Sequence, residues 1–123
     1  MNIPFETLVG KTIIDVSATD NKVVFQTNQG RYVLHHDQDC CESVYLDDIN
    51  GSFEDLIGQV VVVAEEATNP QDYVDLNLPD YKDTSYTWTF YRIRTHKGTV
   101  VLRWYGSSNG YYSESVDFEE ITE

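Results

Sequence analysis

Residues 85–106 read SYTWTFYRIRTHKGTVVLRWYG, and this stretch decides the fold. Branched and aromatic residues alternate with polar residues on both sides of Lys97-Gly98, a dipeptide suited to a two-residue turn. We therefore expect a β-hairpin with strands at 85–96 and 99–106. Counting outward from that turn places Arg92 opposite Arg103 and Tyr91 opposite Trp104.

The pleat of this hairpin divides its side chains between two faces. One face is apolar and suited to a core, and it carries Tyr91, Ile93, Val100, Leu102 and Trp104. The other face carries Trp88, Phe90, Arg92, Arg94, Arg103 and Tyr105. Like charges opposite each other destabilise a sheet, so we expect an anion near Arg92 and Arg103. This anion would come from a bound ligand, from a subunit contact or from a carboxylate of a neighbouring strand. The candidate carboxylates are Glu65, Glu66, Asp117 and Glu119.

The rest of the chain is also mainly β in pattern. Segments 11–16, 22–27 and 31–36 are short, rich in branched residues and separated by turn residues, which predicts a three-stranded meander. The apolar run at 60–67 predicts a strand buried on both faces, and 110–121 predicts a last strand. A Ser cap, early acids and a Gly stop predict one short helix near 52–57. Residues 68–84 read as a long surface loop.

These elements predict a mainly β fold at the margin of α+β. We expect six or seven antiparallel strands in a meander, curved sheet or partial barrel, with one short helix. The length of 123 residues fits a single domain spanning 1–123.

The charge of the chain excludes some functions. It has 21 acidic residues against eight Lys and Arg, a formal net charge of −13, which disfavours direct binding to nucleic acid or to an anionic membrane. The surplus of acids serves either solubility or mimicry of DNA. No apolar run approaches the roughly 20 residues of a membrane span, and the first residues lack the pattern of a signal peptide. We therefore expect a cytoplasmic protein.

A second group of reactive residue types lies at 35–42, reading HHDQDCCE. His35, Cys40 and Cys41 are candidate zinc ligands, but a second separated pair of ligands is missing, so no metal and no cofactor are expected. A bridge between neighbouring cysteines is strained in an extended chain, which predicts reduced thiols. A cysteine nucleophile activated by His35 or His36 is the enzymatic alternative.

A third group is the polar loop that follows the hairpin. Gly106 and Gly110 bracket Ser107, Ser108 and Asn109, and such a loop is either an anion cradle or an ordinary tight turn. Together with the hairpin it defines the candidate ligand-binding residues, for which no catalytic role is expected: Trp88, Arg92, Arg94, Arg103, Tyr105, Ser107, Ser108, Asn109 and Tyr111.

Five motifs connect the chain to a known family. They are QDCCESVY (38–45), DDINGSFEDLIG (47–58), AEEA (64–67), SYTWTFY (85–91) and RWYGSSNGYYSE (103–114). With them, the chain from about residue 8 to 121 resembles a family of small phage and prophage proteins known only as a domain of unknown function. The resemblance implies a source and no particular chemistry, so it assigns no site residue.

These observations favour a non-enzymatic phage or prophage accessory protein. We expect it to bind and sequester an anionic, nucleotide-derived ligand and so to counter host defence. The alternative is an acidic inhibitor, of the DNA-mimic or anti-CRISPR type, that occupies a nucleic-acid site on a host defence protein. A Cys-dependent enzyme is the second alternative, and self-association into a homo-oligomer stays open.

Overall fold

A computed structural model describes residues 2–38, 41–68, 85–108 and 113–122. These residues form eight antiparallel strands, which confirms the mainly β fold predicted from the sequence and raises the strand number above the expected six or seven. The strands are Ile13–Ala18 (β1), Lys22–Thr27 (β2), Gly30–His35 (β3), Ser43–Asn50 (β4), Val63–Thr68 (β5), Ser85–Arg94 (β6), Thr99–Ser108 (β7) and Asp117–Ile121 (β8).

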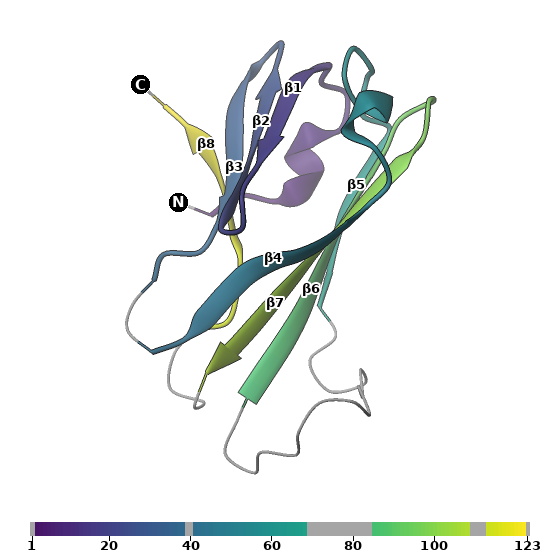
Figure 1. The fold of residues 1–123 in the computed structure, drawn as a ribbon. Coiled ribbons are helices and arrows are strands. Elements are labelled where there is room, and N and C mark those ends of the chain that lie inside the picture. Colours follow the sequence, from purple (N-terminus) through teal and green to yellow (C-terminus); the bar gives the residue numbers. More distant parts are fainter. Residues whose placement is uncertain (1, 39–40, 69–84, 109–112, 123) are drawn as a thin grey trace.

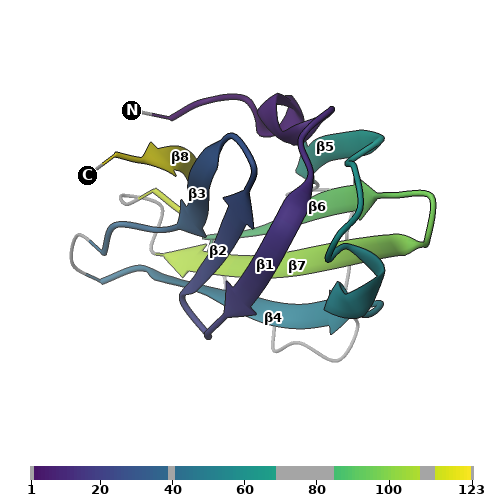
Figure 2. The same ribbon diagram turned by 90° about the horizontal axis from the view of Figure 1, so that it is seen from above.

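The strands make two four-stranded sheets, ordered β1-β2-β3-β8 and β4-β7-β6-β5. The predicted meander is present as β1-β2-β3, and β8 joins its far edge. The first sheet lies across the second, with its strands crossing those of the second at a steep angle (Figures 1 and 2). Each sheet thus has one face toward the other sheet and one face directed away from it.

The core lies between the two sheets and draws on both. Phe5, in the 3-10 turn η1 (Phe5–Leu8), packs its ring 4.8 Å from that of Tyr91 and 5.0 Å from that of Phe118, measured between ring centroids. Because Tyr91 comes from the second sheet and Phe118 from the first, this aromatic group joins the layers. Buried Leu8, Phe25, Leu34, Leu102 and Trp104 are among the residues that extend the same cluster.

The two sheets also meet along the backbone at one end. The Gly10 and Ile13 amides donate to the carbonyls of Val61 and Gln59, at 2.9 and 3.0 Å. The predicted helix near 52–57 is shorter than expected, because its helical part is a single 3-10 turn, η2 (Phe53–Asp55). Ser52 caps it as predicted, accepting a hydrogen bond from the Glu54 amide at 3.3 Å. Among the residues that the structure describes, the sheets remain two separate ladders and do not close a barrel.

Two strand predictions need correction. Strand β4 was not expected, and its short apolar run of Val44, Tyr45 and Leu46 is followed directly by acids at 47 and 48. Strand β5 was expected to be buried on both faces, whereas it lies at an edge of its sheet and is largely exposed. Val60 and Val62, just before β5, are exposed as well. A continuous apolar run is therefore a poor guide to burial here.

The register of the β6–β7 hairpin differs from the expected one by two residues. Arg92 pairs with Val101, and Arg103 pairs with Phe90. The Thr95 amide donates to the Gly98 carbonyl at 2.9 Å, so the turn is centred on His96-Lys97 and not on Lys97-Gly98. The two arginines are therefore not opposite each other, and the argument that they must share an anion was wrong.

Candidate functional site

The hairpin keeps the predicted division into two faces despite its shifted register. A slip of two residues leaves each side chain on the same face of a sheet. The five residues predicted for the core are all at most 1% exposed: Tyr91, Ile93, Val100, Leu102 and Trp104. The alternate residues of β4, β7, β6 and β5 point away from the core, and we call this surface the outer face.

An aromatic strip crosses three strands of the outer face. Tyr105 on β7 is directly paired with Tyr45 on β4 and with Trp88 on β6. Its ring centroid lies 5.7 Å from that of Tyr45, 4.7 Å from that of Trp88 and 6.4 Å from that of Tyr86. Tyr45 is 38% exposed, which places part of this strip in contact with solvent. The strip is the aromatic surface that the sequence predicted, enlarged by Tyr45 and Tyr86.

Arg103 links the aromatic strip to an acidic group. Its guanidinium lies over the Trp88 ring, 5.1 Å from the centroid. Its Nε and Nη2 both donate to Asp47 Oδ2, at 2.9 and 2.6 Å. Asp47 reaches Arg103 from an irregularity in β4, where the register shifts between Leu46 and Asp48. The predicted anion beside Arg103 is thus a carboxylate of the protein, from a strand that the sequence did not reveal.

The other two arginines of the outer face differ from each other. Arg92 Nη1 lies 3.0 Å from Glu65 Oε1 on β5, one of the carboxylates proposed from the sequence. Both side chains of this pair are about half exposed, at 50% and 51%. Arg94 is exposed, and its side chain has no ion-pair or hydrogen-bond partner among the residues that the structure describes. A single arginine of the three therefore presents an uncompensated charge within the described chain.

The predicted serine-glycine loop begins inside a strand. Gly106, Ser107 and Ser108 belong to β7, and Asn109 and Tyr111 lie outside the described residues. Ser108 Oγ donates to Glu114 Oε2 at 2.5 Å, and Thr87 Oγ1 donates to its Oε1 at 2.8 Å. The Ser108 and Thr87 hydroxyls thus already donate hydrogen bonds to a carboxylate of the protein, that of Glu114.

Gly106 serves close packing in place of the predicted anion cradle. It is not among the described glycines with positive φ. A Cβ at this position would lie 2.5 Å from the Glu114 carbonyl oxygen. The glycine therefore permits the backbone of residue 114 to approach β7, which explains the need for glycine without any ligand.

Partial burial affects the chemistry of the aromatic strip. Burial raises the pKa of the Tyr105 phenol, the hydrogen bond with Ser107 acts in the opposite direction, and Tyr45 and Glu114 raise it further. Tyr105 therefore remains a neutral hydrogen-bond donor throughout the physiological pH range.

An acidic depression borders the outer face at β4. It has a volume of about 390 Å³ and is open to solvent. Its lining combines an apolar part with three carboxylates, and consists of Ala18, Thr19, Asp20, Leu46, Asp47, Asp48 and Ile49. Asp47 belongs both to this lining and to the ion pair with Arg103.

The predicted histidine-cysteine group is dispersed. Cys41 is disulfide-bonded, so the expectation of a reduced thiol was wrong, and Cys40 lies outside the described residues. That expectation assumed an extended chain, whereas Cys41 lies between β3 and β4, outside any strand. A disulfide sulfur supplies neither the thiolate nucleophile nor the thiolate zinc ligand.

The two histidines have carboxylate partners. His36 Nε2 lies 2.8 Å from Glu42 Oε2, with both side chains buried, and its Nδ1 donates to the Ser115 carbonyl at 2.8 Å. His35 faces Glu119 and Asp37. The two histidines therefore contact different carboxylates: His36 contacts Glu42, and His35 contacts Asp37 and Glu119.

Fold and site together define a two-sheet antiparallel β protein with an aromatic and arginine-bearing outer face. The chain belongs to the family described as Domain of unknown function (DUF7448), which matches residues 6–118. No curated protein and no solved structure matches this chain. Within the described ranges, no helix has the length and apolar character that a membrane crossing requires. Membership in a family of unknown function, predicted from the motifs, is thus confirmed, and a phage source stays a prediction.

Proposed function

We propose that this protein is a non-enzymatic binding protein that contacts a protein partner through its outer face. The observation that carries the proposal is the aromatic strip of Tyr45, Tyr86, Trp88 and Tyr105, which extends over three strands and borders Arg103. Tyrosine, tryptophan and arginine are the residue types that dominate the binding energy of protein interfaces. Rigid strands hold these side chains, so little conformational entropy is lost on binding.

Charge supports a basic partner surface. The chain carries a formal net charge of −13, and Asp20, Asp47 and Asp48 line the depression beside the strip. Lysine and arginine side chains of a partner would find carboxylates there, next to apolar Leu46 and Ile49. A nucleic-acid-binding site on a host protein has this basic character. This proposal corresponds to the acidic inhibitor expected as an alternative from the sequence. If the protein comes from a phage or prophage, it would act in the host cytoplasm.

Sequestration of a small anionic, nucleotide-derived ligand is the second candidate function. Arg94 favours it, since this exposed guanidinium has no partner among the described residues. The pairing of Arg103 with Asp47 and of Arg92 with Glu65 weighs against it, because a ligand phosphate must displace a carboxylate that the fold already holds in place. The protein partner therefore ranks first.

Site-specific photo-crosslinking tests the proposal. A photoreactive amino acid replaces Tyr45 on the outer face or, as the matched control, exposed Ile14 on the opposite sheet. In host cells we expect a discrete adduct at position 45 and none at position 14. An adduct of twice the chain mass would identify the partner as a second copy of the protein. Equal crosslinking at both positions would contradict a binding role for the outer face.

Binding to the purified crosslinked partner then measures the contribution of the strip. Tyr105→Ser should weaken affinity at least tenfold, which corresponds to about 1.4 kcal/mol, while Ile14→Ser should leave it unchanged. Affinity should also fall as salt concentration rises, because the attraction is partly between opposite charges.

A nucleotide screen separates the two candidate functions. A small ligand at a hundredfold excess over its Kd stabilises a protein by roughly 2.7 kcal/mol, which a thermal-shift assay detects. If cyclic or linear nucleotides stabilise the wild type, and Arg94→Gln and Arg103→Glu abolish the effect, the small-ligand function replaces the protein-binding one.

A further inference from the structure

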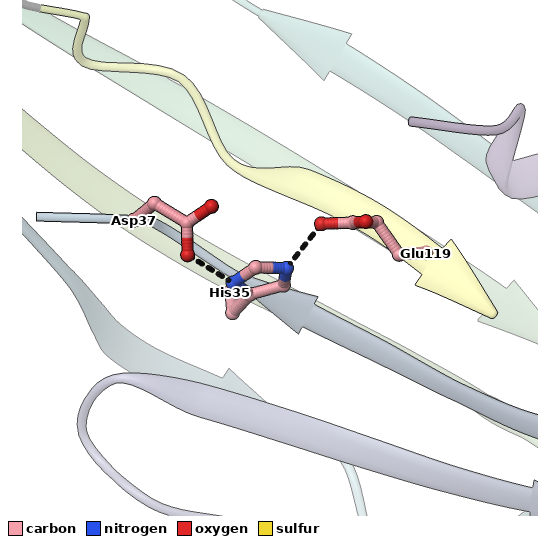
Figure 3. Close-up of side chains that lie close together, drawn as sticks. All are labelled: His35, Asp37 and Glu119. Carbon is pink, nitrogen blue, oxygen red and sulfur yellow. Dashed lines mark hydrogen bonds and ion pairs between the residues drawn. The ribbon is translucent and has the colours of Figure 1, made fainter. Parts of the chain in front are cut away.

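We propose that His35, Asp37 and Glu119 form a binding site for a divalent transition-metal ion, with Zn²⁺ as the best fit. The site lies on the sheet opposite to the aromatic strip and is independent of the proposed function. Figure 3 shows the His35 ring between the two carboxylates. The ring Nε2 lies 2.6 Å from Glu119 Oε1, and Nδ1 lies 3.3 Å from Asp37 Oδ1.

The backbone places these three residues together. His35 ends β3, and Glu119 lies on β8, which pairs with β3 in antiparallel register. Because Val33 is opposite Glu119 and His35 is opposite Asp117, His35 and Glu119 occupy the same outward face of the sheet. Asp37 follows two residues after the end of β3. Two ligands thus stand on paired strands, which fix their positions, while the third extends from a connection.

The distances are compatible with metal binding after a small adjustment. One ligand atom from each residue lies within 4.8 Å of the other two. Two ligand atoms of a tetrahedral zinc ion are about 3.3 Å apart, for metal–ligand bonds of about 2.0 to 2.1 Å. The Asp37 side chain is 83% exposed and can rotate freely, whereas the His35 and Glu119 side chains are 22% and 28% exposed. Rotation of Asp37 is therefore the movement that closes the site.

The chemistry of the ligands selects the type of ion. One imidazole with two carboxylates suits Zn²⁺ better than Ca²⁺ or Mg²⁺, which prefer oxygen ligands. Glu119 and Asp37 face different ring nitrogens of His35, so an ion bound by Nε2 beside Glu119 gains its third ligand when Asp37 rotates away from Nδ1 toward it. Three protein ligands leave a fourth position for water or for a side chain of a binding partner.

Calorimetry on protein without a polyhistidine tag tests the site. We expect the wild type to bind one equivalent of Zn²⁺, and His35→Ala and Asp37→Asn each to lower the affinity at least tenfold. The matched control is His96→Ala, which removes an exposed histidine of the hairpin turn and should bind like the wild type. Because Asp37 is so exposed, its variant should fold normally, which keeps the test valid even if His35→Ala unfolds the protein.

Cobalt provides a second readout, since its visible spectrum reports the ligands. A Co²⁺ spectrum that His35→Ala removes and the Cys40→Ser/Cys41→Ser variant retains would support this ligand set over the cysteines. If wild-type protein binds no more Zn²⁺ than His35→Ala, or if His96→Ala loses binding equally, the proposal is wrong. The three residues would then be an ion-paired group.

Discussion

The inner and outer faces of the β4–β7–β6–β5 sheet consist of alternate residues of the same strands, yet they differ in almost every property. Tyr91, Leu102 and Trp104 on the inner face are at most 1% exposed and pack in the core. The outer face instead carries an aromatic strip and three arginines, of which Arg92 and Arg103 are paired with carboxylates. Burial explains the inner face completely, whereas folding alone does not require tyrosines and arginines outside. This difference is the reason why we propose the outer face as the binding surface.

Replacement of a tryptophan on each face should give the largest contrast. Trp104→Ala removes a side chain that is 1% exposed and should destabilise the protein by about 4 kcal/mol, because it leaves a cavity in the core. Trp88 on the outer face is 7% exposed but is not part of the core cluster, so Trp88→Ala should cost less than Trp104→Ala. Urea denaturation measures both. Equal losses would show that the outer face is as structural as the inner one.

Gly106 tests how tightly the inner face is packed, and Gly98 in the hairpin turn provides the control. An alanine Cβ at position 106 would lie 2.5 Å from the backbone oxygen of Glu114, so Gly106→Ala should destabilise by about 2 to 3 kcal/mol. The matched change Gly98→Ala places a Cβ 2.6 Å from Asp55 Oδ2, the end of a side chain that can move away. We expect a cost below about 1 kcal/mol there. A harmless Gly106→Ala would contradict the close approach of residue 114.

Alkaline pH should affect the inner face more than the outer face. Burial, with Glu66 and Asp117 nearby, raises the pKa of Tyr91 well above its ordinary 10.0. The folded state therefore holds this proton more tightly, so its contribution to stability is complete below about pH 10 and is lost as pH rises further.

Tyr91→Phe should flatten this decrease in stability, measured by denaturation between pH 8 and 12. At neutral pH it should cost about 1 kcal/mol, since the hydroxyl donates to the Val116 carbonyl at 3.4 Å. Tyr105→Phe on the outer face should change the alkaline decrease less. An unchanged decrease in Tyr91→Phe would show that another group causes it.

The arginines of the outer face should contribute least to stability. Arg92→Met breaks a half-exposed ion pair with Glu65 and should change stability by less than about 0.5 kcal/mol. Arg103→Met also removes the contact with the Trp88 ring, so a loss of about 1 kcal/mol is expected. Thermal denaturation compares them. A loss of several kcal/mol for either residue would make it a structural element and remove it from the binding surface.

Much of the fold could be predicted from the sequence, because alternate residues of a strand point to opposite faces of its sheet. The alternation from Tyr91 to Trp104 assigned core and outer residues correctly, although the turn lies one position earlier than predicted. Register depends on turn geometry, which Thr95-His-Lys-Gly98 does not specify from composition alone. Strand β4 escaped notice because its acids resemble a loop, and with it Tyr45 and Asp47 were missed. Only the short apolar run of Val44, Tyr45 and Leu46 could have indicated them.

The candidate site was harder to predict, since its charges are paired across strands far apart in sequence. Asp47 is 56 residues from Arg103, and Glu119 is 84 residues from His35. The local pattern HHDQDCCE instead suggested His35 with the cysteines. Antiparallel pairing of β3 with β8 brought a carboxylate to His35 that no local spacing could reveal.

The irregularity that directs Asp47 toward Arg103 also has a consequence for solubility. Strands β4 and β5 are the two outermost strands of their sheet within the described chain, and an exposed edge strand can recruit strands of other molecules into aggregates. The shifted register at Asp47 breaks the straight line of amide and carbonyl groups along β4, and Glu65-Glu66 place adjacent negative charges on β5. Both borders of the sheet therefore carry features that oppose pairing with strands of other molecules.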